Sequence, residues 1–175
     1  MEAKDSEILT AERKAVVTSP QKITPFLWFN GKVEEAVNFY TSVFKDSQIL
    51  NIRHLPGETP GVKGKAQTAV FTLYGTEFMI LDGGPMFTPS PAISFFVKCE
   101  TQEEVDHYWE KLSEGGQTNR CGWLTDKYGI SWQIIPNALG RLMGDPDPVK
   151  AKNVMNAMMT MTKIDIAGLE KAYDS

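Results

Sequence analysis

The side chains that could do chemistry in this chain are few, and the most informative one lies in residues 121–136. Gln133 stands there in an alternating pattern in which Ile130, Trp132 and Ile134 share one face. Because successive side chains of a strand point to opposite faces, we expect the apolar face to meet helices and Gln133 to point toward whatever the sheet encloses. An amide is costly to bury alone, so it needs either protein partners or a ligand.

Ser94, Asp82 and His54 are the other polar candidates for a ligand-binding site. Ser94 is expected on the same inner face as Gln133, and a purely structural hydroxyl is the alternative. Asp82 precedes Gly83-Gly84, so it is either a ligand-binding carboxylate or a turn residue that accepts from nearby backbone. His54 ends a predicted strand, where an ordinary pKa of about 6.5 suits proton transfer and a solvated surface position is the alternative.

Two tryptophans, Trp28 and Trp123, could stack on a planar ligand, with simple burial in the core as the alternative. Several other chemistries have no motif here. The sequence contains no Gly-x-Gly-x-x-Gly turn, and Gly64-Lys65 lacks the remaining residues of a phosphate-binding loop. It also lacks the Gly-x-Ser-x-Gly elbow of serine hydrolases.

The elements that must position these side chains follow a pattern that occurs twice. Each half reads as a strand, an amphipathic helix and further strands that end in turn residues. The two helix sequences align without a gap, because Glu34-Glu35-Ala36 matches Glu103-Glu104-Val105 at an offset of 69 residues. Thr101 and Glu104 also form a predicted capping box, in which each side chain accepts from the other's backbone. The repeat predicts two copies of one β-α-β-β-β unit.

The predicted fold class is therefore α+β, with paired β-α-β-β-β modules and a C-terminal helical tail. Tail helices are expected after Asp147-Pro148 and after Asp165, which are typical N-terminal caps. We expect an N-terminal extension at 1–22, a two-module domain at 23–136 (module one 23–84, module two 91–136) and C-terminal helices at 137–175.

The tail is rich in methionine, which allows two interpretations. Flexible thioethers could form an adaptable binding surface, or they could fill gaps where the tail packs on the domain. The residues concerned are Met143, Met155, Met158, Met159 and Met161.

The amino-acid composition limits which binding partners and which cellular compartment we expect. Eighteen Lys and Arg against 22 Asp and Glu give a net charge of −4, which offers no electrostatic reason to bind nucleic acid or an anionic membrane. The two cysteines, Cys99 and Cys121, form no Cys-x-x-Cys pair, and the sequence shows no secretory or membrane-spanning run. Reduced thiols in the cytoplasm are the expected state, with a Cys99–Cys121 disulfide as the alternative.

Four motifs in this order carry a likeness to a known family: Glu-Glu-Ala-Val-x-Phe-Tyr at 34–40, Asp-Gly-Gly-Pro at 82–85, the run at 121–136 and Lys-Ile-Asp-Ile at 163–166. The chain resembles the PhnB-like branch of the vicinal oxygen chelate superfamily, which includes glyoxalases, bleomycin-resistance proteins and extradiol dioxygenases. This branch often carries a demethylubiquinone methyltransferase-like label. The resemblance implies paired modules that each curl a sheet around a cavity, in a homodimer.

The resemblance also implies where a divalent metal would bind, because metal-dependent relatives use His, Glu or Gln from the first, fourth, fifth and eighth strands. Of the matching positions in this chain, only Gln133 and Asp82 carry suitable donor atoms, so the ligand set is incomplete. The matching positions are Pro25 or Leu27, Leu81 or Asp82, Ala92 or Ser94, and Gln133.

Whether the protein is an enzyme is left open by the sequence. One hypothesis is a metal-dependent lyase, isomerase or oxygenase acting on a small molecule of unknown identity. The other is a non-catalytic protein that binds or sequesters a small ligand, similar to the bleomycin-resistance proteins. Methyl transfer is a third hypothesis, although no glycine-rich cofactor turn supports it.

Overall fold

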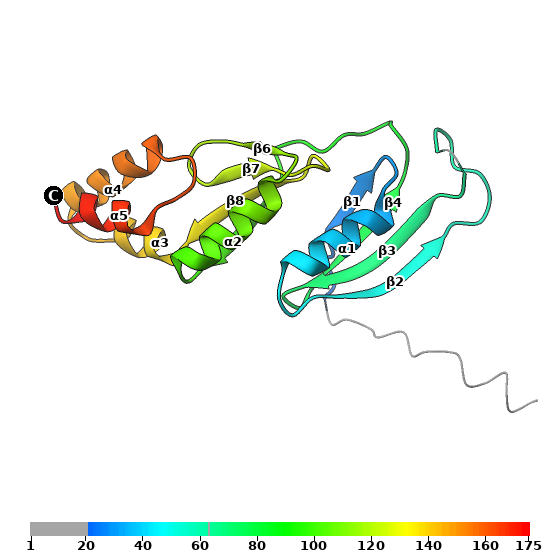
Figure 1. Ribbon diagram of the computed structural model, residues 1–175, viewed down its shortest axis with the longest axis horizontal. Helices are drawn as coiled ribbons and strands as arrows, with labels where there is room; N and C mark the ends of the chain where they lie inside the picture. The colour runs from blue at the N-terminus through cyan, green and yellow to red at the C-terminus, as the bar shows by residue number, and fades with distance from the viewer. Residues whose placement is uncertain (1–20, 63) are drawn as a thin grey trace, which may run out of the picture.

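The computed structural model describes residues 21–62 and 64–175, so most of the expected N-terminal extension lies outside the described residues. Two β-α-β-β-β units follow one another and are succeeded by three helices, which confirms the predicted fold class (Figure 1). The elements are β1 (Phe26–Phe29), α1 (Val33–Val43), β2 (Gln48–His54), β3 (Gln67–Leu73), β4 (Thr76–Asp82), β5 (Phe95–Cys99), α2 (Gln102–Ser113), β6 (Gln117–Thr118), β7 (Trp123–Thr125), β8 (Ser131–Pro136), α3 (Asn137–Met143), α4 (Pro148–Thr160) and α5 (Ile166–Tyr173).

Each unit builds one four-stranded sheet with the same topology. Sheet A has the order β1-β4-β3-β2 and sheet B the order β5-β8-β7-β6. In each sheet the unit's first and last strands along the chain pair in parallel, β1 with β4 and β5 with β8, and the remaining pairs are antiparallel. This shared topology is the structural counterpart of the repeat in the sequence. The topology also shows which residues correspond in the two sheets. Phe96 pairs with Gln133 in sheet B, and Phe26 pairs with Met79 at the corresponding place in sheet A.

One helix packs on each sheet, and the two helices lie on the same side of the molecule (Figure 1). Each helix buries one apolar stripe, as expected for the amphipathic helices that the sequence predicts. Both stripes join the apolar sheet faces in one continuous core. Burial of each large apolar side chain contributes about 1.5–3 kcal/mol, so this core is the main source of stability. The stripe residues are Val33, Ala36, Val37, Tyr40 and Val43 in α1, and Val105, Tyr108, Trp109 and Leu112 in α2.

A buried carboxylate joins the two modules. Asp126 is 3% exposed and accepts hydrogen bonds of 2.8 Å from Tyr40 Oη of module one and from Trp132 Nε1 of module two. Its other oxygen accepts from the backbone N–H groups of Tyr128 and Ile130. Burial raises the pKa of Asp126, and the four hydrogen bonds oppose that rise. The turn that joins β7 to β8 and contains this residue therefore also fixes the position of α1.

The N-terminus of α2 corrects one local prediction. Thr101 Oγ1 accepts from the backbone N–H of Glu104, as a capping box requires. The Glu104 carboxylate, however, accepts from the backbone N–H of Glu100 at 2.8 Å rather than from Thr101. The box is half-formed because the chain turns directly after β5, which brings the amide of Glu100 rather than that of Thr101 to the glutamate.

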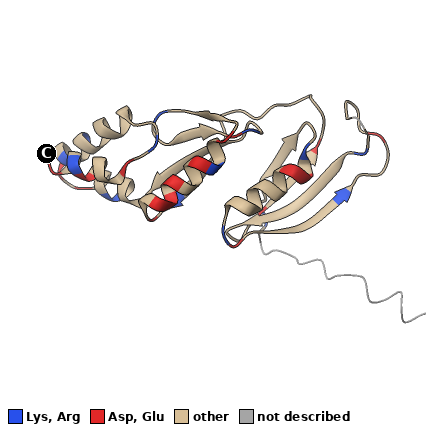
Figure 2. Ribbon diagram, in the orientation of Figure 1, with Lys and Arg blue, Asp and Glu red and all other residues tan. Residues whose placement is uncertain are grey.

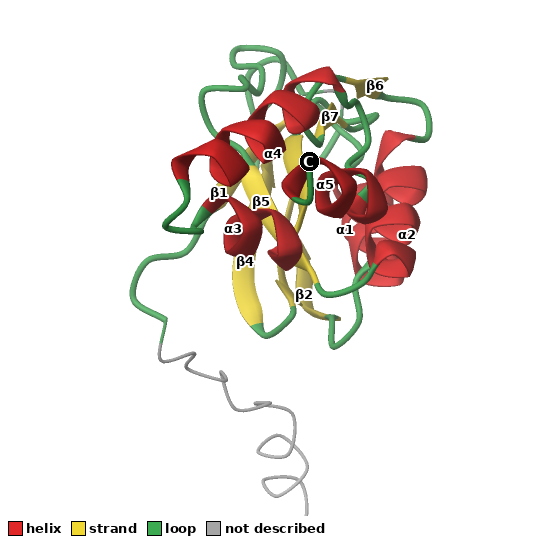
Figure 3. Ribbon diagram, turned by 90° about the vertical axis from the view of Figure 1, so that its left-hand side faces the viewer, coloured by secondary structure: helices red, strands yellow, loops and turns green. Residues whose placement is uncertain are grey.

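The C-terminal helices form a second, smaller core beside sheet B (Figure 3). α3 continues directly from β8, whereas Asp147 and Asp165 cap α4 and α5 by accepting from backbone N–H groups, as predicted. The buried members of this core are Ile135, Leu139, Leu142, Val154, Ile164 and Leu169. Because Ile135 belongs to β8, the helices are packed onto module two rather than attached by a loop alone.

Figure 2 shows acidic residues gathered along α2 and few charges along the strands. No helix in the described part of the chain combines the length and apolar character that crossing a membrane requires. Cys99 and Cys121 are both free thiols.

Candidate functional site

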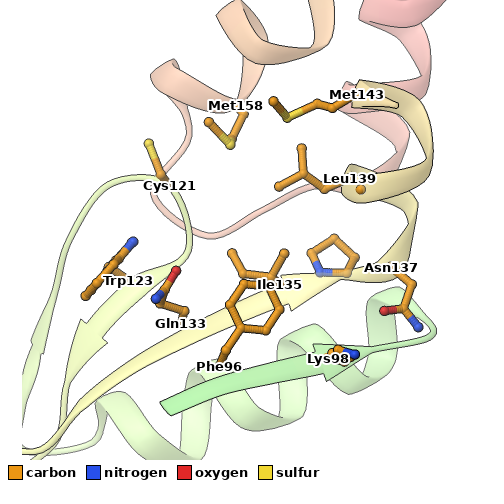
Figure 4. A pocket seen from close by; sticks show the side chains of 12 residues that line it. Phe96, Lys98, Cys121, Trp123, Gln133, Ile135, Asn137, Leu139, Met143 and Met158 are labelled. Carbon is orange, nitrogen blue, oxygen red and sulfur yellow. The ribbon is translucent and has the colours of Figure 1, made fainter. Parts of the chain in front are cut away.

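An open cleft of about 550 Å³ lies between sheet B and the helices α3 and α4. Its floor is the sheet face opposite α2, and its outer wall comes from the two helices (Figure 4). The lining is mainly apolar and includes Phe96, Cys121, Trp123, Ile135, Leu139, Met143 and Met158, together with Gln133 and Lys98. An apolar cleft with a few polar groups is the usual form of a small-molecule site.

Gln133 stands on the floor of this cleft. Its Nε2 donates a 2.9 Å hydrogen bond to Ser94 Oγ. Its two neighbours in register, Phe96 on β5 and Trp123 on β7, also line the cleft. The expected alternation in β8 is confirmed, because Trp132 packs in the core while Gln133 points away from it. The structure thus brings together three of the six predicted site residues.

The other three predicted site residues lie in module one. His54 is exposed at the end of β2, where its Nε2 lies 3.4 Å from Gln67 Nε2. Asp82 is buried at the end of β4 and accepts a 2.8 Å hydrogen bond from the backbone N–H of Gly31. Neither residue shares a sheet with Gln133, and the contact made by Asp82 holds the turn that precedes α1.

Trp28 takes part in local packing on sheet A. Its Nε1 donates to the carbonyl of Gly84 at 2.9 Å, and its ring meets Phe87 edge to face at 5.0 Å. The ring lies so close to Gly83 that a β-carbon there would sit 2.3 Å from it. Gly83 of the Asp-Gly-Gly-Pro motif therefore leaves the space that this indole occupies.

Sequence reasoning missed several residues of the cleft. Phe96 and Lys98 could have been found, since they follow Ser94 at the spacing of one strand face. Met143 and Met158 had been considered as members of a methionine-rich group, of which the structure places these two at the cleft. No signal in the sequence points to Cys121, because its place depends on how the C-terminal helices return to β7.

The donor set does not fit a divalent metal ion. A hard or borderline ion needs several oxygen or nitrogen ligands around one point. On the sheet A face opposite α1, the positions that match Phe96 and Gln133 are held by Phe26 and Met79. Among the described residues, no group of three His, Cys, Asp or Glu side chains is placed to hold a metal. The cleft offers the amides of Gln133 and Asn137 and the thiol of Cys121, and Asn137 Nδ2 donates to the Glu100 carboxylate. We assign no chemistry through a metal at this site.

A second cleft of about 590 Å³ lies between the modules, over the edges of the core residues Phe78, Phe95 and Trp132. Of its polar lining residues, Glu104 accepts from the backbone of Glu100, whose own carboxylate accepts from Asn137. These groups are engaged in holding local structure, so the cleft on sheet B is the better candidate.

Comparison with known proteins identifies the family. The model of the family described as 3-demethylubiquinone-9 3-methyltransferase matches residues 21–135. The chain belongs to this family. It is a PhnB-like protein, which confirms the family resemblance drawn from the four motifs. The family match ends just before α3, so the helices that form the outer wall of the cleft lie beyond it.

Three solved structures are similar to this family member. A putative 3-demethylubiquinone-9 3-methyltransferase, the PhnB protein of Bacillus cereus, is 46% identical over 65% of this chain and 97% of its own, with a TM-score of 0.59. A protein from Staphylococcus aureus is 32% identical over 65% of this chain and 93% of its own, with a TM-score of 0.29. The fosfomycin resistance protein FosX of Listeria monocytogenes, complexed with Mn(II) and sulfate ion, is 14% identical over 65% of this chain and 88% of its own, with a TM-score of 0.46. No curated protein gives a significant match.

Proposed function

We propose that this PhnB-like protein binds a small, mainly apolar molecule in the cleft on sheet B, and that binding needs no metal ion. The observation that carries the proposal is the Gln133 amide, which stands on the floor of an apolar cleft with its nitrogen bound to Ser94. A cleft of about 550 Å³ is within the range of small-molecule sites. Binding or sequestration, rather than catalysis, is the function that this lining supports best.

The test follows the indole N–H resonances of the four tryptophans in ¹⁵N-labelled protein while small apolar fragments are added. Trp123 lines the cleft, whereas Trp109 and Trp132 are buried in the core. We expect some fragments to move the Trp123 resonance and leave those of Trp109 and Trp132 in place; a Trp123→Phe variant assigns the signal. A panel that never moves Trp123 would contradict the proposal.

The rival function is a metal-dependent lyase, isomerase or oxygenase. It requires a divalent ion, whereas the described lining of the cleft offers the amides of Gln133 and Asn137 and the Cys121 thiol, with no His, Asp or Glu. We expect addition of Ni, Mn, Zn or Fe to leave the melting temperature unchanged and elemental analysis of purified protein to find no stoichiometric metal. A metal-induced stabilisation that disappears in Gln133→Leu would favour the enzyme.

Methyl transfer, the activity in the family's description, is the least favoured function. A methyl donor nucleotide usually binds a glycine-rich turn at the edge of a parallel sheet, whereas both sheets here are mixed and each has a single parallel pair. We expect calorimetry to show no binding of S-adenosylmethionine.

A homodimer is part of the same proposal. Helices α3 and α4 cover part of the sheet B face opposite α2, where Phe96 is 54% exposed. The corresponding face of sheet A has no such helices and exposes Phe26 at 53%, and Phe87, 58% exposed, packs against Trp28 of the same strand. Large exposed aromatics on one face are typical of an interaction surface. The cytoplasm remains the proposed location, in keeping with two free thiols.

A further inference from the structure

The outer wall of the cleft is made by residues beyond the family-matched segment. Leu139 and Met143 belong to α3 and Met158 belongs to α4, whereas the family match ends at residue 135. Figure 4 shows these side chains opposite Phe96 and Gln133, across the cleft from the sheet. The floor is thus a feature of the family fold, and the wall is contributed by the C-terminal helices.

This wall is held in place from the strand side. The backbone N–H groups of Cys121 and Gly122 donate 2.8 Å hydrogen bonds to the carbonyls of Met161 and Thr162, which directly follow α4. Met158 therefore lies within one turn of an anchored segment. Because its backbone is held so close by, we expect Met158 to form a fixed part of the wall and not a mobile lid.

A second anchor holds the same segment to α2. Gln102 Nε2 donates to the carbonyl of Ile164 at 3.2 Å, and Gln102 Oε1 accepts from the backbone N–H of Ile166 at 2.9 Å. Lys163 adds an ion pair of 2.6 Å with Asp106. The wall is thus tied to both a strand and a helix of module two.

The lining chemistry favours an aromatic ring. Phe96 and Trp123 stand on the floor, and the thioethers of Met143 and Met158 stand on the wall. Rings pack well against other aromatics, and sulfur–aromatic contacts add about 0.3–1.5 kcal/mol each. Lys98 is the only charged residue among the described residues that line the cleft, and it lies on an exposed strand edge.

Gln133 adds a requirement for a hydrogen-bond donor. Its nitrogen donates to Ser94 Oγ. Its oxygen makes no hydrogen bond within the described part of the chain and is not fully buried, so it is free to accept from a ligand. Figure 4 shows this oxygen directed toward the side of Cys121 and the wall. A site built to hydrogen-bond a hydroxyl discriminates strongly against an analogue that lacks it, because the site's own polar group then loses its water without replacement.

We infer that the C-terminal helices make this cleft selective for flat aromatic compounds that carry a hydroxyl group. Gln133 Oε1 accepts the hydroxyl proton, and the thioethers of Met143 and Met158 cover the ring. This inference rests on the proposed function, since it names the ligand class of the same cleft.

The first experiment uses 1-naphthol as the probe and protein labelled with ¹³C at the methionine methyl groups. We expect the Met143 and Met158 signals to shift on titration, while those of Met155 and Met86, which do not line the cleft, stay in place. Single Met→Leu variants assign the signals. If 1-naphthol moves the Trp123 indole signal but neither cleft methionine, the ligand binds without the wall and the inference is overturned while the proposed function stands.

The second experiment compares 1-naphthol with 1-methylnaphthalene, which has the same shape and lacks the hydroxyl. We expect the wild-type protein to bind 1-naphthol about tenfold more tightly or better, equivalent to 1.4 kcal/mol or more, and Gln133→Leu to abolish the preference. Met155→Leu serves as the matched control and should keep it. Equal affinity of the two probes for wild-type protein would overturn the inference without any variant, and failure of both probes to move Trp123 would overturn this inference together with binding of such compounds.

Discussion

At the scale of single residues, Asp126 and Gln133 have different surroundings, because Asp126 is buried between the modules whereas Gln133 lines the cleft on sheet B. Asp126 accepts from a tyrosine of module one and a tryptophan of module two, so its carboxylate links two halves that share no sheet hydrogen bonds. Removal of one partner from a buried hydrogen-bonded group leaves the other partners without acceptors. The residue is thus expected to contribute to stability without contacting a ligand.

Replacement of Asp126 by Asn should destabilise the protein by about 2–3 kcal/mol, because the amide NH₂ faces donors that need an acceptor. The loss depends on pH. Burial raises the pKa of Asp126, so the folded state binds this proton more tightly than the unfolded state and wild-type stability falls as pH rises through the folded pKa. Urea unfolding should therefore show a larger difference between wild type and variant near pH 4.5 than near pH 7.5. An equal difference at both pH values would contradict the assignment.

The two cysteines should differ in reactivity. Cys99 is fully buried, and burial raises the pKa of its thiol to about 12, whereas Cys121 is half-buried at the cleft. Since the thiolate is the reactive form, a thiol reagent should modify one cysteine per folded chain and two after unfolding in urea. Cys121→Ser should abolish the fast reaction. Fast modification of that variant would show that Cys99 is accessible.

The sequence was sufficient to place Gln133, and it failed for the wall of the cleft. Strand alternation has a strict period of two, so the neighbours of Gln133 determine its face. Met143 and Met158 lie in helices whose apolar residues divide between their own core and the cleft, and periodicity alone does not separate these uses. His54 and Asp82 were singled out by chemical type, but their position depends on which sheet each strand joins.

At the scale of elements, the helices and the longer strands of both modules were predictable because turn residues and apolar stripes mark them clearly. The C-terminal helices were harder to predict. α3 starts directly after Pro136, without the capping residue that identified α4 and α5. β6 and β7 span two and three residues, which is too short for a reliable alternating pattern. The expected division of the chain at residue 136 stays a prediction.

The junction between β7, β8 and the tail should be sensitive to a single added methyl group. Gly122 has a φ of +79°, and a β-carbon there would lie 2.7 Å from Ile135 Cδ1 and 2.8 Å from the carbonyl oxygen of Ile134. Gly122→Ala should cost about 3 kcal/mol or more, because the backbone oxygen cannot move aside. Thermal unfolding measures the loss.

Gly140 is the matched control for this substitution. It lies within α3, and a β-carbon there would meet no atom within 4 Å. Gly140→Ala should stabilise the helix by about 0.5–1 kcal/mol, because alanine restricts the unfolded chain. Equal melting temperatures for the two variants would contradict the packing of the tail against Gly122.

At the scale of the whole molecule, the two modules have the same sheet topology but differ in how many faces of the sheet carry helices. Sheet B carries α2 on one face and the tail helices over part of the other, where Phe96 is 54% exposed. Sheet A carries α1 on one face, while the other face presents Phe26, Trp28 and the segment containing Phe87. A repeat in which only one copy carries helices on both faces leaves an apolar surface that a second copy of the chain could cover.

Sedimentation velocity on wild-type protein and on Phe26→Asp tests the proposed dimer. Phe26 alternates with Leu27, which packs against the core, so the aspartate should point outward and leave the fold intact. We expect a wild-type dimer and a shift of the variant toward monomer by a factor of at least ten in dissociation constant, since a charge at a buried contact costs more than about 1.4 kcal/mol. Val149→Asp is the control, because Val149 is 63% exposed at the start of α4, away from sheet A. A monomeric wild-type protein, or a Phe26→Asp variant that dimerises as well as the control, would show that this face is not the interface.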